Sequence, residues 1–229
     1  MINVAVIGVG GIAGGHINAY GRLGNTTLYA LCDKDPARAR GQGRSITINI
    51  DTGAQAPLDV VAYTDWRACL ADPQVEMVDI CLPSDLHAPV AIAALEAGKH
   101  VLCEKPMALH AEDCARMIAA AEASGTRLMI AQVIRFWPEY LALKAAVDSG
   151  KYGKLRTATF RRISSVPLWT SDGWMTDPAR GGGVGLDLHV HDVDFINFLL
   201  GLPREVYARG VEERYGMAAM MGEFRYDDE

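Results

Sequence analysis

The stretch VIGVGGIAGGH at residues 6–16 decides the fold class. It holds Gly8, Gly10 and Ala13 in the spacing G-x-G-x-x-A, and it overlaps the end of the short apolar run INVAVI at residues 2–7. The run predicts a buried strand, and the residues after the glycines predict a helix. In such a turn Gly8 allows a tight bend, Gly10 lets the backbone approach a pyrophosphate, and Ala13 lets the helix pack on the strand. The helix N-terminus then offers free N–H groups to the phosphates.

The second predicted strand, residues 27–33, ends in an acid. Asp33 lies 20 residues after Ala13, which is the distance expected for a carboxylate that binds the adenosine ribose of a dinucleotide. A carboxylate would repel the 2′-phosphate of NADP, so the sequence favours NAD as cofactor. Lys34, Arg38 and Arg40 lie close enough in the sequence to leave NADP as an alternative.

Strands and helices alternate through the first part of the chain. Further strands are predicted at residues 75–83, 99–106 and 127–134, and helices at residues 11–24, 85–98 and 111–125. This alternation predicts right-handed crossovers and a parallel sheet. The fold class is therefore α/β, with a doubly wound (Rossmann) sheet in a dinucleotide-binding domain at residues 1–132. Residues 41–60, rich in Gly, Thr and Asn, predict an inserted surface loop or small hairpin.

The pattern changes after about residue 135. Helices are predicted at residues 138–150 and 184–200, and strands at residues 154–163, 204–215 and 217–226. Alternating apolar and polar residues in these strands are typical of a half-exposed sheet. We therefore predict a second, α+β domain at residues 133–229, with an open mixed or antiparallel sheet.

The composition excludes several classes of protein. The chain has 229 residues, of which 50% are hydrophobic and 22% are charged, so a packed core is expected. A net charge of −6 argues against nucleic acid as a partner. Five cysteines without a C-x-x-C pair predict neither a disulfide framework nor a cysteine zinc site, and a reducing cytoplasm is the expected compartment. No stretch reaches the length of a membrane span.

Two histidines and three aspartates are crowded into DLHVHDVDF at residues 187–195. The cluster could hold a metal through His189-x-His191, relay a proton, or form a polar helix face. On a single helix Asp187, His191 and Asp194 share one stripe, and His189 points elsewhere. Because two such histidines reach one ion only from extended backbone, we predict no metal site.

Glu104 and Lys105 stand at the carboxyl end of a predicted parallel strand, in HVLCEKP at residues 100–106. Ligands bind at that edge of an open α/β sheet. Pro106 disfavours helix at Lys105, so the lysine stays extended. Its ammonium group is either a surface charge or a catalytic donor.

These elements together resemble the Gfo/Idh/MocA family of NAD(P)-dependent oxidoreductases, which includes inositol, glucose and other sugar or polyol dehydrogenases. The resemblance rests on the glycine turn, Asp33, Pro83 with His87, A-G-K-H-V-x-x-E-K-P at 97–106, Arg135-Phe136-x-Pro138, and G-G-G-x-x-x-D-x-x-x-H-x-x-D at 181–194. It covers roughly residues 1–200 well and the last thirty loosely.

The resemblance implies a reaction centre of Lys105, Asp187 and His191. It implies that the cofactor is bound by Gly8, Gly10, Gly11, Ile12, Asp33, Lys34, Pro83, His87, Glu104 and Lys105. Arg135, Trp174 and His189 are candidate substrate contacts. In alcohol oxidation a hydride goes to the nicotinamide and the hydroxyl proton to a base, for which His191 is suited and Lys105 is the contender. Asp187 would orient the pair.

Three functions therefore compete. The first is a dehydrogenase acting on a sugar, polyol or related small molecule, with neither nucleic acid nor membrane as partner. The second is a catalytically incomplete dinucleotide-binding protein, either a sensor or a truncated enzyme. The third is a metal-dependent hydrolase built on His189-x-His191. Family members are usually longer than this chain, so the second domain is expected to be incomplete and to form a homo-oligomer through its sheet.

Overall fold

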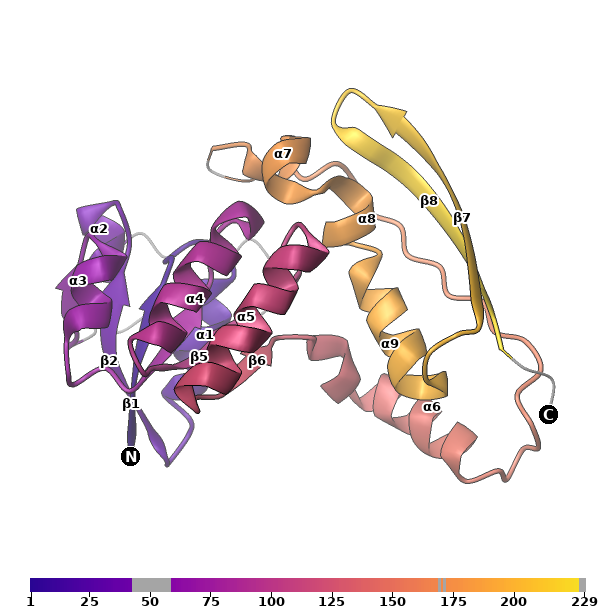
Figure 1. The fold of residues 1–229 in the computed structure, drawn as a ribbon, viewed down its shortest axis with the longest axis horizontal. Helices are drawn as coiled ribbons and strands as arrows, with labels where there is room; N and C mark the ends of the chain where they lie inside the picture. The colour runs from indigo at the N-terminus through magenta and orange to yellow at the C-terminus, as the bar shows by residue number, and fades with distance from the viewer. Residues whose placement is uncertain (43–58, 169, 171, 227–229) are drawn as a thin grey trace. The chain divides into compact units, whose positions relative to one another are not determined.

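The computed structural model describes residues 1–42, 59–168, 170 and 172–226 (Figure 1). Within them the chain divides into two compact units, Met1–Ala131 and Gln132–Glu229. Most of the loop or hairpin predicted at residues 41–60 lies outside the described residues.

The first unit is built on a six-stranded parallel sheet in the order β3-β2-β1-β4-β5-β6. In chain order the strands are β1 (Ile2–Ile7), β2 (Thr26–Cys32), β3 (Val61–Tyr63), β4 (Met77–Ile80), β5 (His100–Cys103) and β6 (Leu128–Ile130). The strand order reverses between β1 and β4, and in such sheets the crevice at their carboxyl ends binds ligands. The predicted doubly wound α/β class is confirmed.

Helices cover both faces of this sheet (Figure 1). They are α1 (Ala13–Tyr20), α2 (Pro36–Ala39), α3 (Trp66–Ala71), α4 (His87–Glu96) and α5 (Ala111–Ser124), with a 3-10 turn η1 (Ser84–Leu86). Alternate residues of β1 point to opposite faces: Val4 and Val6 pack with α1, whereas Ala5 and Ile7 pack with α3, α4 and α5. Both faces of the sheet are therefore buried, as a doubly wound fold requires.

Four of the five cysteines belong to these two cores, and Cys114 is partly buried on α5. Burial raises the pKa of the Cys32, Cys69 and Cys81 thiols to about 12. They are small core residues, and none of the five forms a disulfide.

The sequence analysis missed β3 and α3. The strand has three residues, too few for an alternating pattern to stand out, and α3 has six. The remaining strands of the sheet are present, but β4 and β5 end before Pro83 and Pro106, which had been included in the predicted ranges.

The second unit combines short helices with one β-hairpin. Its elements are η2 (Val133–Phe136), α6 (Pro138–Asp148), η3 (Trp174–Thr176), α7 (Pro178–Gly181), α8 (Gly183–Asp187), α9 (Val190–Leu200), β7 (Glu205–Glu213) and β8 (Gly216–Arg225). The two strands pair antiparallel. A small core forms where Phe195 and Leu199 of α9 pack on Ile134. The Tyr140 ring meets Phe195 edge-on, with centroids 4.7 Å apart.

Two predictions for this unit are wrong. Residues 154–163 do not form a strand, because no neighbouring strand satisfies their backbone groups. Residues 184–200 do not form one helix, because α8 ends at Asp187 and α9 begins at Val190. Between them the His189 N–H bonds the carbonyl of Val184, five residues back, at 2.8 Å. A bond to the fifth residue back widens the turn and interrupts the four-residue bonding of an α-helix, so the segment forms two short helices.

A cavity of about 1420 Å³ lies within the second unit. Its walls come from the extended segment 153–164, from α8 and α9 with His189 between them, and from β8. Every residue of β7 is exposed.

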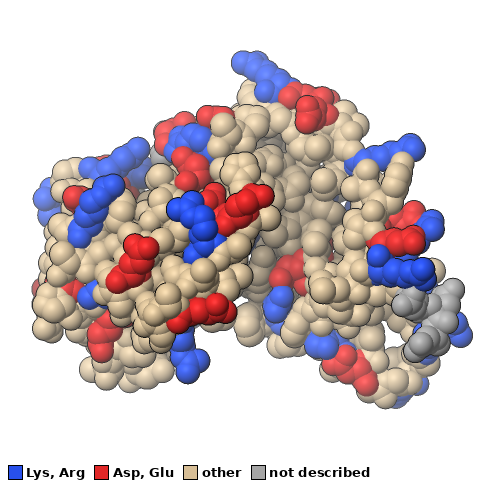
Figure 2. Space-filling view, in the orientation of Figure 1, with Lys and Arg blue, Asp and Glu red and all other residues tan. Residues whose placement is uncertain are grey.

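The visible face of the described residues carries basic and acidic side chains interspersed (Figure 2). Among the described residues, no helix is both long and apolar enough to cross a lipid bilayer.

Candidate functional site

The glycine turn after β1 has one face packed against the sheet and one face open. Gly8 has φ +91°, and a Cβ there would lie 2.6 Å from the carbonyl oxygen of Cys81, so a larger residue is excluded. A Cβ on Gly10 would meet nothing within 4 Å. The open face at Gly10 is the space that a pyrophosphate needs in order to approach the backbone.

The helix that follows this turn presents its N-terminus without a protein cap. At α1, Ile12 makes no side-chain capping bond, and the first turn has no acidic residue. The first N–H groups of a helix need acceptors, and together with the helix dipole they attract an anion. The turn and the helix therefore fit a dinucleotide phosphate, with Gly11 and Ile12 in the predicted position between them.

Asp33 lies just past the end of β2 and is held against the glycine turn. Its Oδ2 accepts the Val9 N–H at 2.8 Å, and its Oδ1 accepts the Asp35 N–H at 2.9 Å. A carboxylate has about four acceptor positions, so two remain for ribose hydroxyls. Lys34, beside it, is exposed. The structure thus brings together the two parts of the dinucleotide motif that the sequence predicted.

Pro83 and His87 lie on the segment after β4. Pro83 precedes η1, and His87 opens α4 with only 1% of its surface exposed. The His87 Nδ1 lies 2.7 Å from the carbonyl oxygen of Pro106, and its Nε2 lies 2.9 Å from that of Leu82. Burial lowers the pKa of His87, although both carbonyls favour its charged form. His87 therefore links the ends of β4 and β5, and a direct contact with the cofactor stays a prediction.

Glu104 and Lys105 follow β5 at the same edge of the sheet. Glu104 is 6% exposed, and its Oε2 accepts the Lys105 N–H at 3.0 Å. The Lys105 side chain is partly exposed. The predicted position of Lys105, at the carboxyl edge where ligands bind, agrees with the structure.

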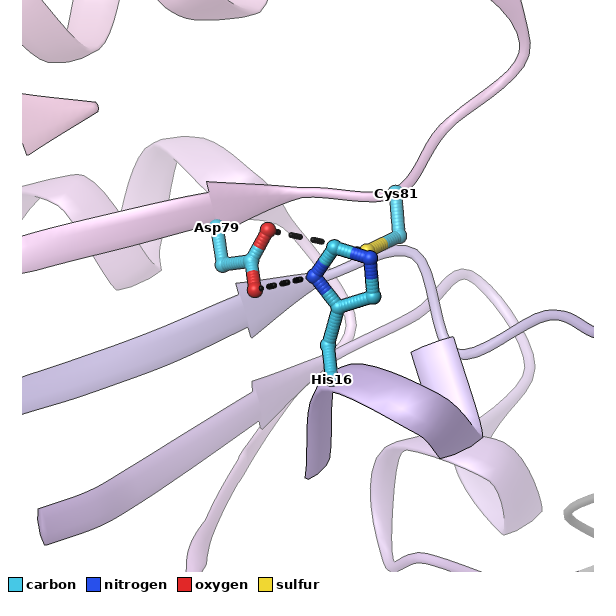
Figure 3. Close-up of side chains that lie close together, drawn as sticks. All are labelled: His16, Asp79 and Cys81. Atoms are coloured by element: carbon cyan, nitrogen blue, oxygen red, sulfur yellow. Dashed lines mark hydrogen bonds and ion pairs between the residues drawn. The ribbon is translucent and has the colours of Figure 1, made fainter. Parts of the chain in front are cut away.

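A histidine that the sequence analysis did not select lies at the centre of this edge. His16 of α1 points to Asp79 of β4 and to Cys81 just beyond it (Figure 3). His16 Nδ1 is 2.8 Å from Asp79 Oδ2, and His16 Nε2 is 2.9 Å from Glu104 Oε1. We call His16, Asp79 and Glu104 the His16 cluster. The signal that could have revealed it is Asp79, a fully buried carboxylate in an otherwise apolar strand.

Two arginines of the second unit bind two of the aspartates in the acid-and-histidine cluster at residues 187–195. Arg135 donates from Nε and Nη2 to Asp194, at 2.6 and 2.5 Å. Arg162 donates from Nε and Nη2 to Asp192, at 2.9 Å in both bonds. Asp192 and Asp194 therefore bind arginines of the fold. Arg135, predicted as a weak substrate contact, also lies over the Phe198 ring, 4.8 Å from its centroid.

The remaining residues of that cluster lie on both sides of the helix interruption. Asp187 ends α8, and His191 is the second residue of α9, so they do not share a stripe of one straight helix. His189 Nε2 lies 3.4 Å from where a Cβ of Gly222 in β8 would be, so this side chain faces the hairpin. Trp174 begins η3 and is partly buried.

Within the described ranges, the side chains whose ligand atoms come close enough to share a metal are His16, Asp79 and Cys81. Among the described residues, the pair His189-x-His191 does not belong to a group of three or more such ligands. Lys105 belongs to the first unit, and Asp187 and His191 belong to the second.

Two protein-family models match the chain in succession. Residues 2–132 match an oxidoreductase family with an NAD-binding Rossmann fold, and residues 140–228 match the GFO/IDH/MocA C-terminal domain. These two matches cover both units of the structure.

The curated relatives and solved structures that resemble this chain include dehydrogenases. Myo-inositol 2-dehydrogenase of Thermotoga maritima is 30% identical over 95% of this chain and 61% of its own length. Inositol 2-dehydrogenase of Salmonella typhimurium is 35% identical over 87% of this chain and 54% of its own length. The structure of the WlbA dehydrogenase from Bordetella pertussis, in complex with NADH and UDP-GlcNAcA, superposes with a TM-score of 0.83. It is 25% identical and covers 98% of this chain and 63% of its own. The chain thus spans little more than half the length of these proteins.

Proposed function

Since this chain belongs to the Gfo/Idh/MocA oxidoreductase family, with its NAD-binding Rossmann fold, we propose that it is an NAD(P)-dependent dehydrogenase acting on CH–OH groups. The substrate class we propose is a sugar, polyol or related small molecule, as the inositol dehydrogenases among its relatives support. The observation that carries the proposal is the glycine turn, whose open face at Gly10 lies beside the anchored carboxylate of Asp33.

In this proposal the first unit binds the dinucleotide. The glycine turn and the uncapped N-terminus of α1 bind the pyrophosphate, and the two unused acceptor positions of Asp33 bind the adenosine ribose. The nicotinamide ring, when bound, takes up or gives back the hydride. Lys105 lies at the edge of the sheet where that reaction would occur.

Three side chains would handle the oxygen and its proton. The Lys105 ammonium holds the substrate oxygen as it becomes a carbonyl, because a fixed positive charge stabilises the developing negative one. His191 takes the hydroxyl proton, since the ordinary pKa of histidine lies close to neutral pH. Asp187 orients this pair.

The first prediction tests these roles. Lys105→Met and His191→Ala should each lower turnover by about 100-fold or more, since a positioned acid–base group contributes that much, while NADH still binds. His189→Ala is the matched control and should keep most of the turnover, because its ring faces β8. The measurement is NADH formation, followed by absorbance, against a panel of sugars and polyols. Full activity of His191→Ala together with loss in His189→Ala would reverse the assignment.

A second candidate is a protein that binds the dinucleotide without turnover. The observation that favours it is the cavity of about 1420 Å³ beside a hairpin whose first strand is wholly exposed. A substrate site built on such a unit would lack supporting side chains. Tight NADH binding with no reduction by any member of the panel would favour this candidate over the dehydrogenase.

We further propose a reducing cytoplasm as the working compartment, on the strength of five free cysteines. Self-association through the hairpin of the second unit is the proposed assembly.

A further inference from the structure

We propose that His16 is a positioning residue, held as an imidazolium between two buried carboxylates, which fixes α1 to the strand end that carries Lys105. The proposal rests on the proposed function, because it concerns the edge of the sheet where that function places the cofactor and Lys105. It adds a residue to which no part of the dinucleotide motif or of the predicted reaction centre assigns a role.

The geometry requires a charged ring. Both nitrogens of His16 face a carboxylate oxygen, at 2.8 Å from Asp79 and 2.9 Å from Glu104. A neutral imidazole has a single N–H, and an ionised carboxylate only accepts, so both bonds form together only with the imidazolium. Asp79 is 0% exposed and Glu104 is 6% exposed, so water does not replace either bond.

The electrostatic environment supports the same state. Burial alone would lower the pKa of His16, but its hydrogen bonds to Asp79, Cys81 and Glu104 outweigh burial and raise the pKa. Burial would raise the pKa of Glu104, but the hydrogen bond from His16 and the nearby positive charges lower it. Each partner thus favours the charged form of the other.

The His16 cluster joins three elements of the proposed cofactor site. His16 lies on the helix that follows the glycine turn, and Tyr20, one turn later, donates to the same Asp79 oxygen at 2.8 Å. The Glu104 N–H donates to the carbonyl of Ile80, and its second carboxylate oxygen accepts the Lys105 N–H. The Glu104 side chain therefore sets the backbone direction at Lys105, and His16 holds that side chain in place.

Charge gives the cluster a second effect. Without His16, two buried carboxylates would face each other at the edge where an anionic pyrophosphate has to bind. Like charges in a poorly solvated place disfavour each other and any further anion. The imidazolium cancels one of the two negative charges at this edge.

A metal ion is the competing explanation for the same side chains. Ligand atoms of His16, Asp79 and Cys81 all lie within 4.8 Å of one another. The His16–Asp79 contact of 2.8 Å, however, is a hydrogen-bond length, whereas two ligands at about 2.0 Å from a tetrahedral zinc stand farther apart than that. Burial also raises the pKa of Cys81 to about 12, and a metal binds the thiolate. The ion-pair cluster is therefore the better description.

The first experiment measures the protonation state of the His16 ring directly, in the protein without cofactor. Nitrogen-15 NMR of histidine-labelled protein, assigned through the backbone, should show both His16 ring nitrogens at imidazolium shifts near pH 8. They should not titrate between about pH 6 and 9, whereas an unperturbed imidazole titrates near about 6.5. A neutral ring at His16, or stoichiometric metal whose removal by chelator shifts its nitrogens, would overturn the proposal. Because no cofactor is used, this result stands even if the protein binds no dinucleotide.

The second experiment measures NADH binding by fluorescence titration. His16→Gln should weaken binding about tenfold or more, and the matched control His110→Gln should stay within about twofold. If charge is the cause, adding Asp79→Asn to His16→Gln should restore a large part of the affinity, because it removes the uncompensated carboxylate.

Unchanged affinity in His16→Gln, or no recovery in the double variant, contradicts the proposal. Should His16→Gln fail to fold, the NMR measurement on the unaltered chain still decides it. Absence of NADH binding by the unaltered chain would count against the proposed function alone.

Discussion

At Asp33 one carboxylate serves both the fold and the proposed cofactor. Its two backbone bonds, to Val9 and Asp35, hold the end of β2 against the glycine turn. Its negative charge remains at the place where the adenosine ribose is expected. The same residue therefore controls which dinucleotide binds and how well the turn is held.

The second prediction follows from these two roles. NAD should bind more tightly than NADP, because the Asp33 carboxylate repels a 2′-phosphate. Asp33→Ser should shift the preference toward NADP, aided by exposed Lys34. It should also weaken the binding of both cofactors, because the shorter side chain loses the hydrogen bond from the Val9 N–H that holds the glycine turn.

Calorimetric titration with both dinucleotides checks this prediction. Asp35→Ser is the control, since serine also caps the start of α2, where Asp35 accepts the Ala37 N–H. A clear NADP preference in the unaltered chain would contradict the reasoning.

The third prediction is that the two glycines of the turn have different roles, Gly8 in stability and Gly10 in cofactor binding. Gly8→Ala places a Cβ 2.6 Å from a backbone oxygen at a φ of +91°, and should lower the free energy of unfolding by about 3 kcal/mol or more. Gly10→Ala meets nothing within 4 Å, so stability should change by less than about 1 kcal/mol. NADH affinity should nevertheless fall about tenfold, because the methyl occupies the pyrophosphate's approach.

Thermal unfolding and NADH titration of the two variants provide the measurement. If Gly10→Ala bound NADH as well as the unaltered chain does, the open face would not be the phosphate site.

The helix α9 is held by arginines from earlier in the chain, and this leads to the fourth prediction. Arg162→Met leaves the carboxylate of Asp192, 5% exposed, without its bidentate partner. We expect a loss of about 2 kcal/mol, below the range for a fully buried pair because water reaches the guanidinium.

Arg161→Met is the matched control, since Arg161 is exposed, and should change stability by less than about 0.5 kcal/mol. Urea denaturation followed by tryptophan fluorescence distinguishes the two. Equal effects of the two substitutions would show that the Arg162–Asp192 pair does not stabilise the unit.

At the level of elements, the sequence predicts what is encoded locally. Gly8 and Asp33 were identified because the turn and the strand that carry them have a fixed spacing. The His16 cluster was missed, because its bonds join residues 63 and 88 positions apart. The arginine partners of Asp192 and Asp194 were missed for the same reason, since they lie 30 and 59 positions earlier.

The prediction of secondary structure failed where an element depends on contacts with other parts of the chain. The segment 154–163 has the alternation of a strand, but a strand forms only when another strand supplies hydrogen-bond partners. The predicted helix 184–200 is interrupted where the His189 N–H bonds the Val184 carbonyl five residues back, so α8 and α9 are separate.

At the scale of the molecule, the hairpin of the second unit presents a face on which exposed apolar side chains alternate with charged ones. Tyr207, Val211 and Met221 are 50%, 57% and 62% exposed, and each of the two strands has one unpaired edge among the described residues. Exposed edges and apolar faces of this kind pair readily with a second chain.

The fifth prediction is that the protein self-associates through this face. Size-exclusion chromatography with light scattering should show an oligomer that dissociates on dilution, and Val211→Lys with Met221→Lys should shift it to the monomer. Ile118→Lys, at an apolar residue 48% exposed on the first unit, should have no such effect. A monomer at every concentration tested would contradict the proposed assembly.

The positions of the cysteines allow local opening of the first unit to be measured by thiol labelling. All five thiols belong to the first unit, and the second has none. Four are shielded in the cores, so a disulfide reagent reaches them only when that unit opens, whereas partly exposed Cys114 reacts first. The labelling rate of the four buried thiols therefore reports local opening of the Rossmann unit alone and is independent of changes in the hairpin. A dinucleotide that binds the closed form should slow this labelling in proportion to its occupancy, which makes thiol counting an assay for ligands even where no turnover can be measured.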